Sequence, residues 1–199
     1  MIQPSVYSRS QIVDAAYELI REEGWSSVST RAIAKKLGSS TMPIYSHVRS
    51  VGELEKELRI KARKLLQEYQ QRKYTEHVLL NLAFGYVTFA RDEQYLFRFL
   101  YLESPEQLNL EDGISMKESF IREFGPDSNV AKALTAMEES GQDVLIQYTW
   151  IFTHGLAMLV NAGSFGKNSD QIILKLLMNA GEAFYTWGIN NQEGVNDNE

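Results

Sequence analysis

The sequence STRAIAKKLGSSTMPIYSHV, residues 29–48, predicts two short helices that meet at a tight turn. On each side of the turn, apolar residues recur at the spacing of one helix face. They are Ile33, Ala34 and Leu37 before the turn, and Ile44, Tyr45 and Val48 after it. Gly38 stands at the corner, where glycine adopts the positive φ that other residues resist. We therefore expect the two helices to pack against each other and against a common core.

Both helices have start signals in this stretch. Ser29 can cap the first helix, because a serine oxygen accepts a hydrogen bond from a free backbone N–H. Counted from a Ser40 cap, Pro43 falls in the first turn of the second helix, where the N–H that proline lacks has no helical partner. Two short helices at this spacing are typical of a helix-turn-helix, whose second helix enters the major groove of DNA.

The rest of the chain also has helical periodicity, whereas strand-like alternation is scarce. Further helices are expected over residues 9–23, 53–72, 76–91, 93–102, 115–124, 129–140, 143–162 and 170–188. The sequence therefore predicts an all-α fold of about nine helices. The most apolar stretch, residues 144–163, includes His154 and Asn161, and so predicts a buried helix rather than a membrane span. Residues 1–17 lack the basic start and apolar run of an export signal, so we expect a cytoplasmic protein.

Composition and charge limit the classes of function that the chain can have. The 199 residues include no cysteine, and the three histidines show no metal-ligand spacing. Without a Gly-rich phosphate loop or a nucleophile elbow, we expect no cofactor, no metal and no enzymatic activity, with an all-α enzyme as an alternative. Residues 1–75 carry a net charge of +5 and residues 76–199 a net charge of −11. This asymmetry favours a polyanionic partner at the N-terminal end only.

The first 70 residues or so resemble the DNA-binding domain of the TetR family of bacterial transcription regulators. The residues that carry the resemblance are Ile12, Ala15, Ala16, Gly24, Trp25, Ser29, Thr30, Ile33, Ala34, Leu37, Gly38, Ser40, Ile44, Tyr45, His47, Val48 and Leu54. The resemblance implies a three-helix N-terminal domain followed by a helical domain for ligand binding and dimerisation. The expected domains are residues 1–52 for DNA binding, a connecting helix at 53–72, an effector and dimerisation domain at 73–190, and a polar tail at 191–199.

The resemblance also implies which residues contact DNA. Thr41, Met42 and Ser46 are expected at base edges, with Pro43 against a thymine methyl group. Tyr45 and His47 resemble the phosphate-contacting pair of the family. The full set of expected DNA-binding residues is Ser29, Thr30, Arg31, Ser40, Thr41, Met42, Pro43, Tyr45, Ser46, His47 and Arg49. Their alternative role is local: helix capping, an exposed helix start, or a core-edge aromatic for Tyr45.

The C-terminal part has a second, shorter resemblance. Trp150, His154 and Gly155, in a Trp–x3–His–Gly pattern, are similar to the signature of one TetR subgroup, the WHG type. Apolar ligand cavities contain a few placed polar groups, and the candidate lining residues are Phe89, Tyr101, Phe120, Trp150, His154 and Met158. They predict a site for a small apolar or aromatic ligand, although each could equally belong to the core.

The family also implies a two-fold homodimer through the last two long helices, which contain many small residues. A dimer presents two helix-turn-helix motifs to successive major grooves of a near-palindromic, double-stranded operator. We therefore predict a ligand-responsive DNA-binding regulator, most simply a repressor that its ligand releases from the operator. The alternative within the same class is a regulator without a small-molecule effector, controlled by a protein partner.

Overall fold

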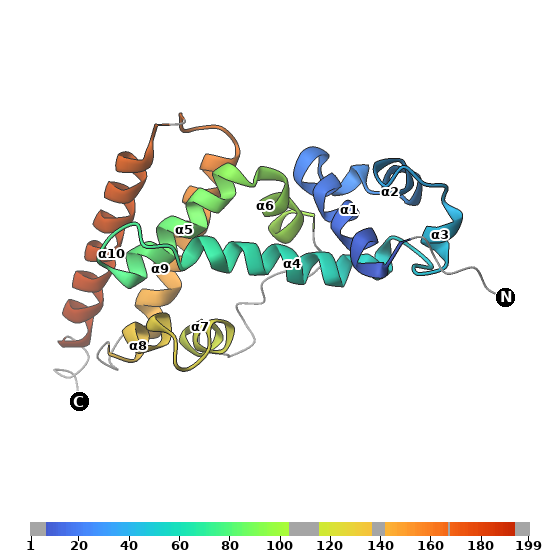
Figure 1. Ribbon diagram of the computed structural model, residues 1–199. Coiled ribbons are helices and arrows are strands. Elements are labelled where there is room, and N and C mark those ends of the chain that lie inside the picture. Colours follow the sequence, from blue (N-terminus) through green and yellow to red (C-terminus); the bar gives the residue numbers. More distant parts are fainter. Residues whose placement is uncertain (1–6, 104–115, 137–141, 167, 194–199) are drawn as a thin grey trace. The chain divides into compact units, whose positions relative to one another are not determined.

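The computed structural model describes residues 7–103, 116–136, 142–166 and 168–193 (Figure 1). Within these ranges the chain forms ten α-helices, one short 3-10 helix and no strand. The helices are α1 (Arg9–Glu23), α2 (Thr30–Lys36), α3 (Met42–Tyr45), α4 (Gly52–Gln70), α5 (Val78–Asp92), α6 (Gln94–Tyr101), α7 (Met116–Phe124), α8 (Asn129–Thr135), α9 (Gln142–Asn161) and α10 (Asp170–Glu193). The predicted all-α class is confirmed for this part of the chain. None of its helices has both the length and the apolar character of a membrane span.

The helix starts follow from short polar side chains, with one correction. Ser8 caps α1 in a capping box with Gln11, and Ser29 accepts a hydrogen bond from the Ala32 N–H at 3.1 Å. The expected Ser40 cap of α3 is wrong, because Thr41 is the N-cap residue and makes no side-chain capping bond. Pro43 then occupies the second helical position, where its missing N–H still costs no helical hydrogen bond.

The chain divides into two compact units that do not follow the sequence order. The first unit comprises Met1–Leu65 and Glu93–Gln107, and the second comprises Leu66–Asp92 and Leu108–Glu199. The division falls inside α4, between Leu65 and Leu66. However, α6 belongs to the first unit, although the sequence analysis assigned its residues to the effector domain.

The core of the first unit forms where α6 packs against α1. Ile12 and Ile20 of α1 and Phe97 of α6 are fully buried. Trp25, in the 3-10 helix Trp25–Ser27, lies with its ring 5.0 Å from that of Phe99. Burying several large apolar side chains is worth about 1.5–3 kcal/mol for each, so α6 contributes substantially to the stability of this unit.

A buried arginine on α4 binds to α6 within the first unit. Arg59 of α4 is only 6% exposed. Its guanidinium donates to a carboxylate oxygen of Glu55 at 2.7 Å and to the Phe99 carbonyl at 2.5 Å, and it lies over the Phe99 ring at 4.3 Å. These partners replace the water that the buried charge gives up.

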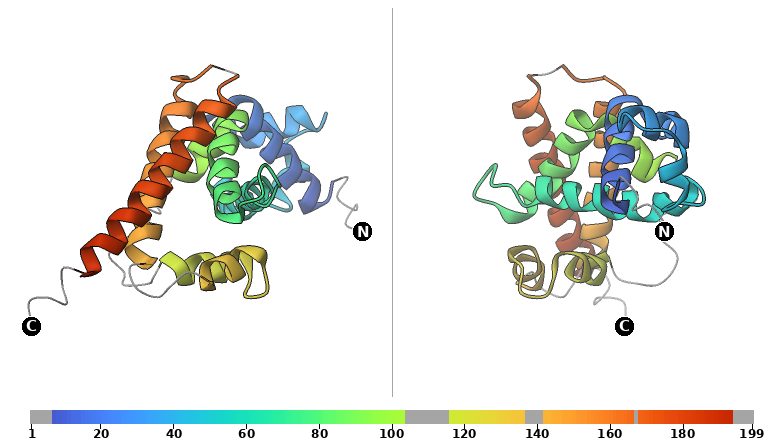
Figure 2. Two further views of the ribbon diagram at one scale, coloured as in Figure 1. Left: turned by 90° about the vertical axis from the view of Figure 1, so that its left-hand side faces the viewer. Right: turned by 45° about the vertical axis from the view of Figure 1, so that its right-hand side comes forward.

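The second unit is built around α5, which packs against α9 and α10. Figure 2 shows α9 and α10 running side by side in both views. Val87, Phe89 and Ala90 of α5 have no exposed surface. The side-chain amide of Asn161 on α9 donates to the Ala90 carbonyl at 2.9 Å, which links the ends of these two helices.

Gly85 allows α5 to cross very close to the last turn of α4. A Cβ atom at position 85 would lie 2.3 Å from the Tyr69 carbonyl oxygen and 2.6 Å from the Gln70 Cα. Both of these are backbone atoms, which cannot move aside as a flexible side chain can. The crossing therefore requires glycine, and it brings Tyr69 edge-on to Phe89, with 5.6 Å between ring centroids.

The short helices α7 and α8 close a second apolar cluster. Its buried members are Leu82, Val130, Leu134 and Ile146, with Val78, Leu79, Phe120, Ile121 and Phe124 packed against them. Ser128 caps α8 by accepting a hydrogen bond from the Ala131 N–H at 3.0 Å. The cluster fixes the α7–α8 junction against the start of α5.

Candidate nucleic-acid interface

The turn between α2 and α3 has the predicted geometry. Gly38 adopts a φ of 62°, the left-handed conformation expected at the corner. The Ser39 N–H donates to the Ala34 carbonyl at 2.9 Å, and the Tyr7 hydroxyl donates to the Leu37 carbonyl at 2.6 Å. These bonds satisfy carbonyl groups that the end of α2 leaves without helical partners.

The short helix α3 separates its side chains into two sets. Ile44 is 1% exposed and Val48, just after the helix, is 4% exposed, so both pack into the first unit. Met42 is 81% exposed and Tyr45 is 58% exposed. A large apolar side chain left almost fully in water on a helix of four residues points to a surface that another molecule covers.

The neighbouring hydroxyl and imidazole groups are also accessible. Ser46 is exposed and donates to the Pro43 carbonyl at 2.6 Å, whereas Thr41 and His47 are half-buried. Ser40 is exposed in the turn. Thr41, Met42, Tyr45 and Ser46 thus lie within one short segment, at a spacing that lets them reach a single groove.

An ion pair that the sequence analysis did not anticipate fixes the end of α3. The Arg9 guanidinium donates to the His47 carbonyl at 2.6 Å and to a Glu57 carboxylate oxygen at 2.6 Å. The hydrogen bond to Glu57 raises the pKa of Arg9, followed by Coulombic attraction from Glu57 and Glu53. Arg9 therefore joins α1, the end of α3 and α4, and acts as a positioning residue for the exposed segment.

The remaining predicted DNA-binding residues lie at the start of α2 and between α3 and α4. The Ser29 hydroxyl is engaged as the α2 cap, Thr30 is half-buried and Arg31 is exposed. The Arg49 side chain is exposed, and its backbone N–H donates to a Glu53 carboxylate oxygen at 3.0 Å. Both arginines can supply positive charge next to the α3 surface, as a phosphate backbone requires.

The six candidate ligand-binding residues do not form one site in either unit. Tyr101 belongs to the first unit, where its ring lies 5.2 Å from that of Phe97, and the other five belong to the second. Phe89 is fully buried in the core. Phe120 packs against the α7–α8 cluster, and Met158 is half-buried on α9.

Trp150 and His154 do come together, one turn apart on α9. Their rings are stacked with centroids 5.2 Å apart and 10° between planes. The Tyr86 hydroxyl lies 2.8 Å from the His154 Nδ1. Burial lowers the pKa of His154, because the charged imidazole loses hydration there. The three rings form a polar contact inside a largely apolar interface between α5 and α9.

Among the residues that the structure describes, no group of three or more His, Asp or Glu side chains comes together.

The turn and the two short helices have the geometry of a helix-turn-helix, and comparison with known proteins finds a family model that matches this part of the chain. Residues 12–56 match the family model "Bacterial regulatory proteins, tetR family". This segment, which includes most of α1, all of α2 and α3 and the start of α4, is similar to the N-terminal domain of that family.

Two curated proteins that are similar to this chain are named as HTH-type transcriptional regulators. The chain is 36% identical over 59 residues to the uncharacterised HTH-type transcriptional regulator Rv0681 of Mycobacterium tuberculosis, with 30% of this chain and 27% of that protein covered. It is 31% identical over 87 residues to the uncharacterised HTH-type transcriptional regulator YobS of Bacillus subtilis, with 42% of this chain and 46% of that protein covered. The matches thus span between about a quarter and a half of these relatives.

Proposed function

We propose that this protein is a DNA-binding transcription regulator whose α3 segment contacts the major groove. The observation that carries the proposal is the exposure of Met42 and Tyr45 beside the buried Ile44 and Val48. The TetR-family match over residues 12–56 and the net charge of +5 over residues 1–75 support it. In this proposal Thr41, Met42 and Ser46 contact base edges, Tyr45 and His47 contact phosphates, and Arg31 adds positive charge.

Fluorescence anisotropy with DNA fragments from around the gene tests this proposal. The wild type is expected to bind one fragment preferentially, with affinity that falls as salt rises. Tyr45→Ala should weaken all fragments about tenfold, whereas Met42→Ala should mainly reduce the preference among them. Ile60→Ala is the matched control, because Ile60 is 59% exposed but lies on α4. Binding without sequence preference or salt dependence contradicts the proposal.

We further propose that the regulator is a homodimer formed through α9 and α10. Both helices expose apolar side chains, which are Tyr148, Ile151 and Leu159 on α9, and Ile172, Met178, Tyr185 and Trp187 on α10. Gly155 and Gly181 have no neighbour within 4 Å of the position of a Cβ atom, which leaves room for a second pair of helices. A dimer then presents two α3 segments to a near-palindromic operator.

Sedimentation of charged variants tests the dimer. Leu159→Glu and Ile172→Glu should shift the protein to a monomer, because each places a charge in an apolar interface. Lys132→Glu, an exposed position on α8, serves as the control. If both apolar variants sediment as the wild type does, the interface lies elsewhere.

We also propose that a small molecule bound in the second unit controls DNA binding, most simply by releasing a repressor. The family resemblance, including the Trp150–His154–Gly155 pattern of the WHG subgroup, supports this part. A ligand changes DNA affinity only through different affinities for the two states of the protein. Anisotropy titrations of the operator complex with candidate ligands test the effect directly, and unchanged DNA affinity at saturating ligand contradicts it.

A further inference from the structure

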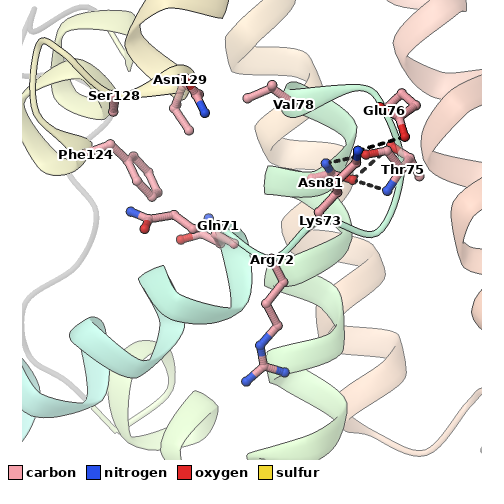
Figure 3. A pocket seen from close by; sticks show the side chains of 12 residues that line it. Gln71, Arg72, Lys73, Thr75, Glu76, Val78, Asn81, Phe124, Ser128 and Asn129 are labelled. Atoms are coloured by element: carbon pink, nitrogen blue, oxygen red, sulfur yellow. Dashed lines mark hydrogen bonds and ion pairs between the residues drawn. The ribbon is translucent and has the colours of Figure 1, made fainter.

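A cavity of about 540 Å³ lies in the second unit, at the end of α4. One wall is formed by the last residues of α4, the loop that follows and the start of α5, and the other by the α7–α8 junction (Figure 3). None of the six ligand-binding residues predicted from the sequence contributes to its lining. The volume is in the range of cavities that hold small molecules in other proteins.

Gln70 marks this cavity as a binding site. The residue is only 6% exposed and lines the cavity, yet its carboxamide makes no hydrogen bond within the described part of the chain. A largely buried amide needs a hydrogen-bonding partner, which water or a ligand can supply. No fully enclosed side-chain nitrogen or oxygen among the described residues lacks a partner. The Gln70 amide therefore keeps its remaining accessible surface at the cavity, where an incoming molecule can reach it.

Asn81 provides the contrast on the same cavity wall. It is 8% exposed, and its oxygen accepts from the Thr75 N–H at 2.7 Å and from the Thr75 hydroxyl at 2.9 Å. Its NH2 group donates to the Thr75 carbonyl at 2.9 Å. Asn81 thus holds the loop after α4 in place, whereas Gln70, buried to a similar degree, has no such structural use for its amide.

The other lining residues indicate the chemistry of the ligand. Figure 3 shows Gln71 and Phe124, from opposite walls, lying close to each other with Asn129 beyond them. Carboxamides both donate and accept hydrogen bonds, so their best complement is a group that does the same, such as an amide or a lactam. Val78, Val130 and the Phe124 ring supply an apolar wall that suits a flat ring.

The cations at the cavity are already engaged. The Arg72 guanidinium lies 3.7 Å from the centre of the Tyr69 ring, and Figure 3 shows it extending away from the other labelled side chains. Lys73 pairs with Glu76 at 2.9 Å, and both side chains are largely in solvent. An anionic ligand would gain little from these groups, so the site favours an uncharged molecule.

We propose that this cavity binds a small, uncharged aromatic carboxamide or lactam, with the Gln70 amide as its central hydrogen-bonding partner. The regulatory meaning of the site rests on the proposed function, since a ligand here would contact the end of α4. Ligand binding itself does not depend on that function and can be measured without DNA.

Benzamide, benzoate and toluene, titrated into the 15N-labelled full chain, separate the possibilities. Benzamide should shift the Gln70 side-chain NH2 resonances and bind more tightly than the other two. Gln70→Leu should weaken benzamide binding about fivefold to tenfold, the usual effect of losing one neutral hydrogen bond. Gln171→Leu, on the exposed face of α10, is the matched control and should leave binding unchanged.

Three results overturn the inference: no shift of the Gln70 resonances with any probe, tighter binding of benzoate or toluene than of benzamide, or equal binding by Gln70→Leu. If Gln70→Leu does not fold, Asn129→Trp provides the test, because Asn129 is exposed and a large side chain there should block the cavity. Operator binding is measured separately on the same variants. A wild type that binds operator DNA but not benzamide contradicts only the cavity assignment, and a wild type that binds benzamide but not operator DNA contradicts only the regulator.

Discussion

Replacing Gly85 by alanine tests whether the crossing of α4 and α5 sets the stability of the second unit. The new methyl carbon would lie 2.3 Å from the Tyr69 carbonyl oxygen and 2.6 Å from the Gln70 Cα. Ordinary contacts between carbon atoms are about 3.5–4.0 Å. The two helices would therefore have to separate by roughly 1 Å, a distance that forfeits a quarter to a half of the attraction between the atoms involved.

The expected magnitude combines opposing effects. Overpacking in a well-packed core costs about 1–3 kcal/mol, and the weakened Tyr69–Phe89 contact adds roughly 1 kcal/mol. Alanine is favoured over glycine within a helix by about 1 kcal/mol. The net loss in the free energy of unfolding is then about 1–3 kcal/mol, which lowers the Tm of a chain of this length by about 2–12 °C.

Thermal unfolding followed by circular dichroism measures this loss. Gly166→Ala, in the loop between α9 and α10, is the matched control, because no atom lies within 4 Å of the position of its Cβ. That variant should unfold at the same temperature as the wild type or slightly above it. A Gly85→Ala protein as stable as the wild type would refute the close crossing.

Three further predictions concern other contacts. Arg59→Met should lower the free energy of unfolding in urea by about 2–4 kcal/mol, because Glu55 and the Phe99 carbonyl lose their partner. Lys56→Met, on the exposed face of α4, should change this free energy little. Burial lowers the pKa of His154, so as the pH falls the unfolded chain takes up the proton before the folded chain does. The Tm should therefore be highest above about pH 6.5 and fall as the pH drops below it. His154→Gln should flatten this part of the Tm profile, and an unchanged profile would contradict the assignment. Ser29→Ala should cost about 1 kcal/mol through the loss of the α2 cap, while Ser40→Ala should be nearly neutral; equal losses would show that α3 is capped by Ser40 after all.

The sequence predicted features that depend on a few neighbouring residues. The Gly38 corner, the Ser29 cap and the two-sided α3 helix all have signals within one or two turns, because helical periodicity and capping are local. The Ser40 cap was wrong for a local reason as well: Ser40 and Thr41 are both good N-cap residues, and sequence preference does not distinguish them. Helix boundaries elsewhere agree with the structure to within two residues, except the ends of α8 and α10, which each lie five residues from the expected position.

Features that join distant segments could not be predicted in this way. Arg9 reaches His47 and Glu57, and Arg59 reaches Phe99, across about 40 positions with no shared pattern. The sequence does not predict the burial of the Gln70 amide either, since glutamine in the last turn of an amphipathic helix is usually solvated. Aromatic residues suggested the predicted ligand pocket, but core packing accounts for the buried position of Phe89 as well as a ligand does.

The placement of α6 bears on how the protein can be dissected. A fragment ending after residue 72, at the boundary that the sequence suggests, retains the segment that matches the TetR family model but omits the helix that covers Trp25 and the apolar face of α1. Such a truncated protein would expose apolar surface to water and leave the Arg59 guanidinium without its Phe99 acceptor. Recombinant work on DNA recognition therefore requires either the intact polypeptide or a fusion that returns residues 93–101 to the shortened chain.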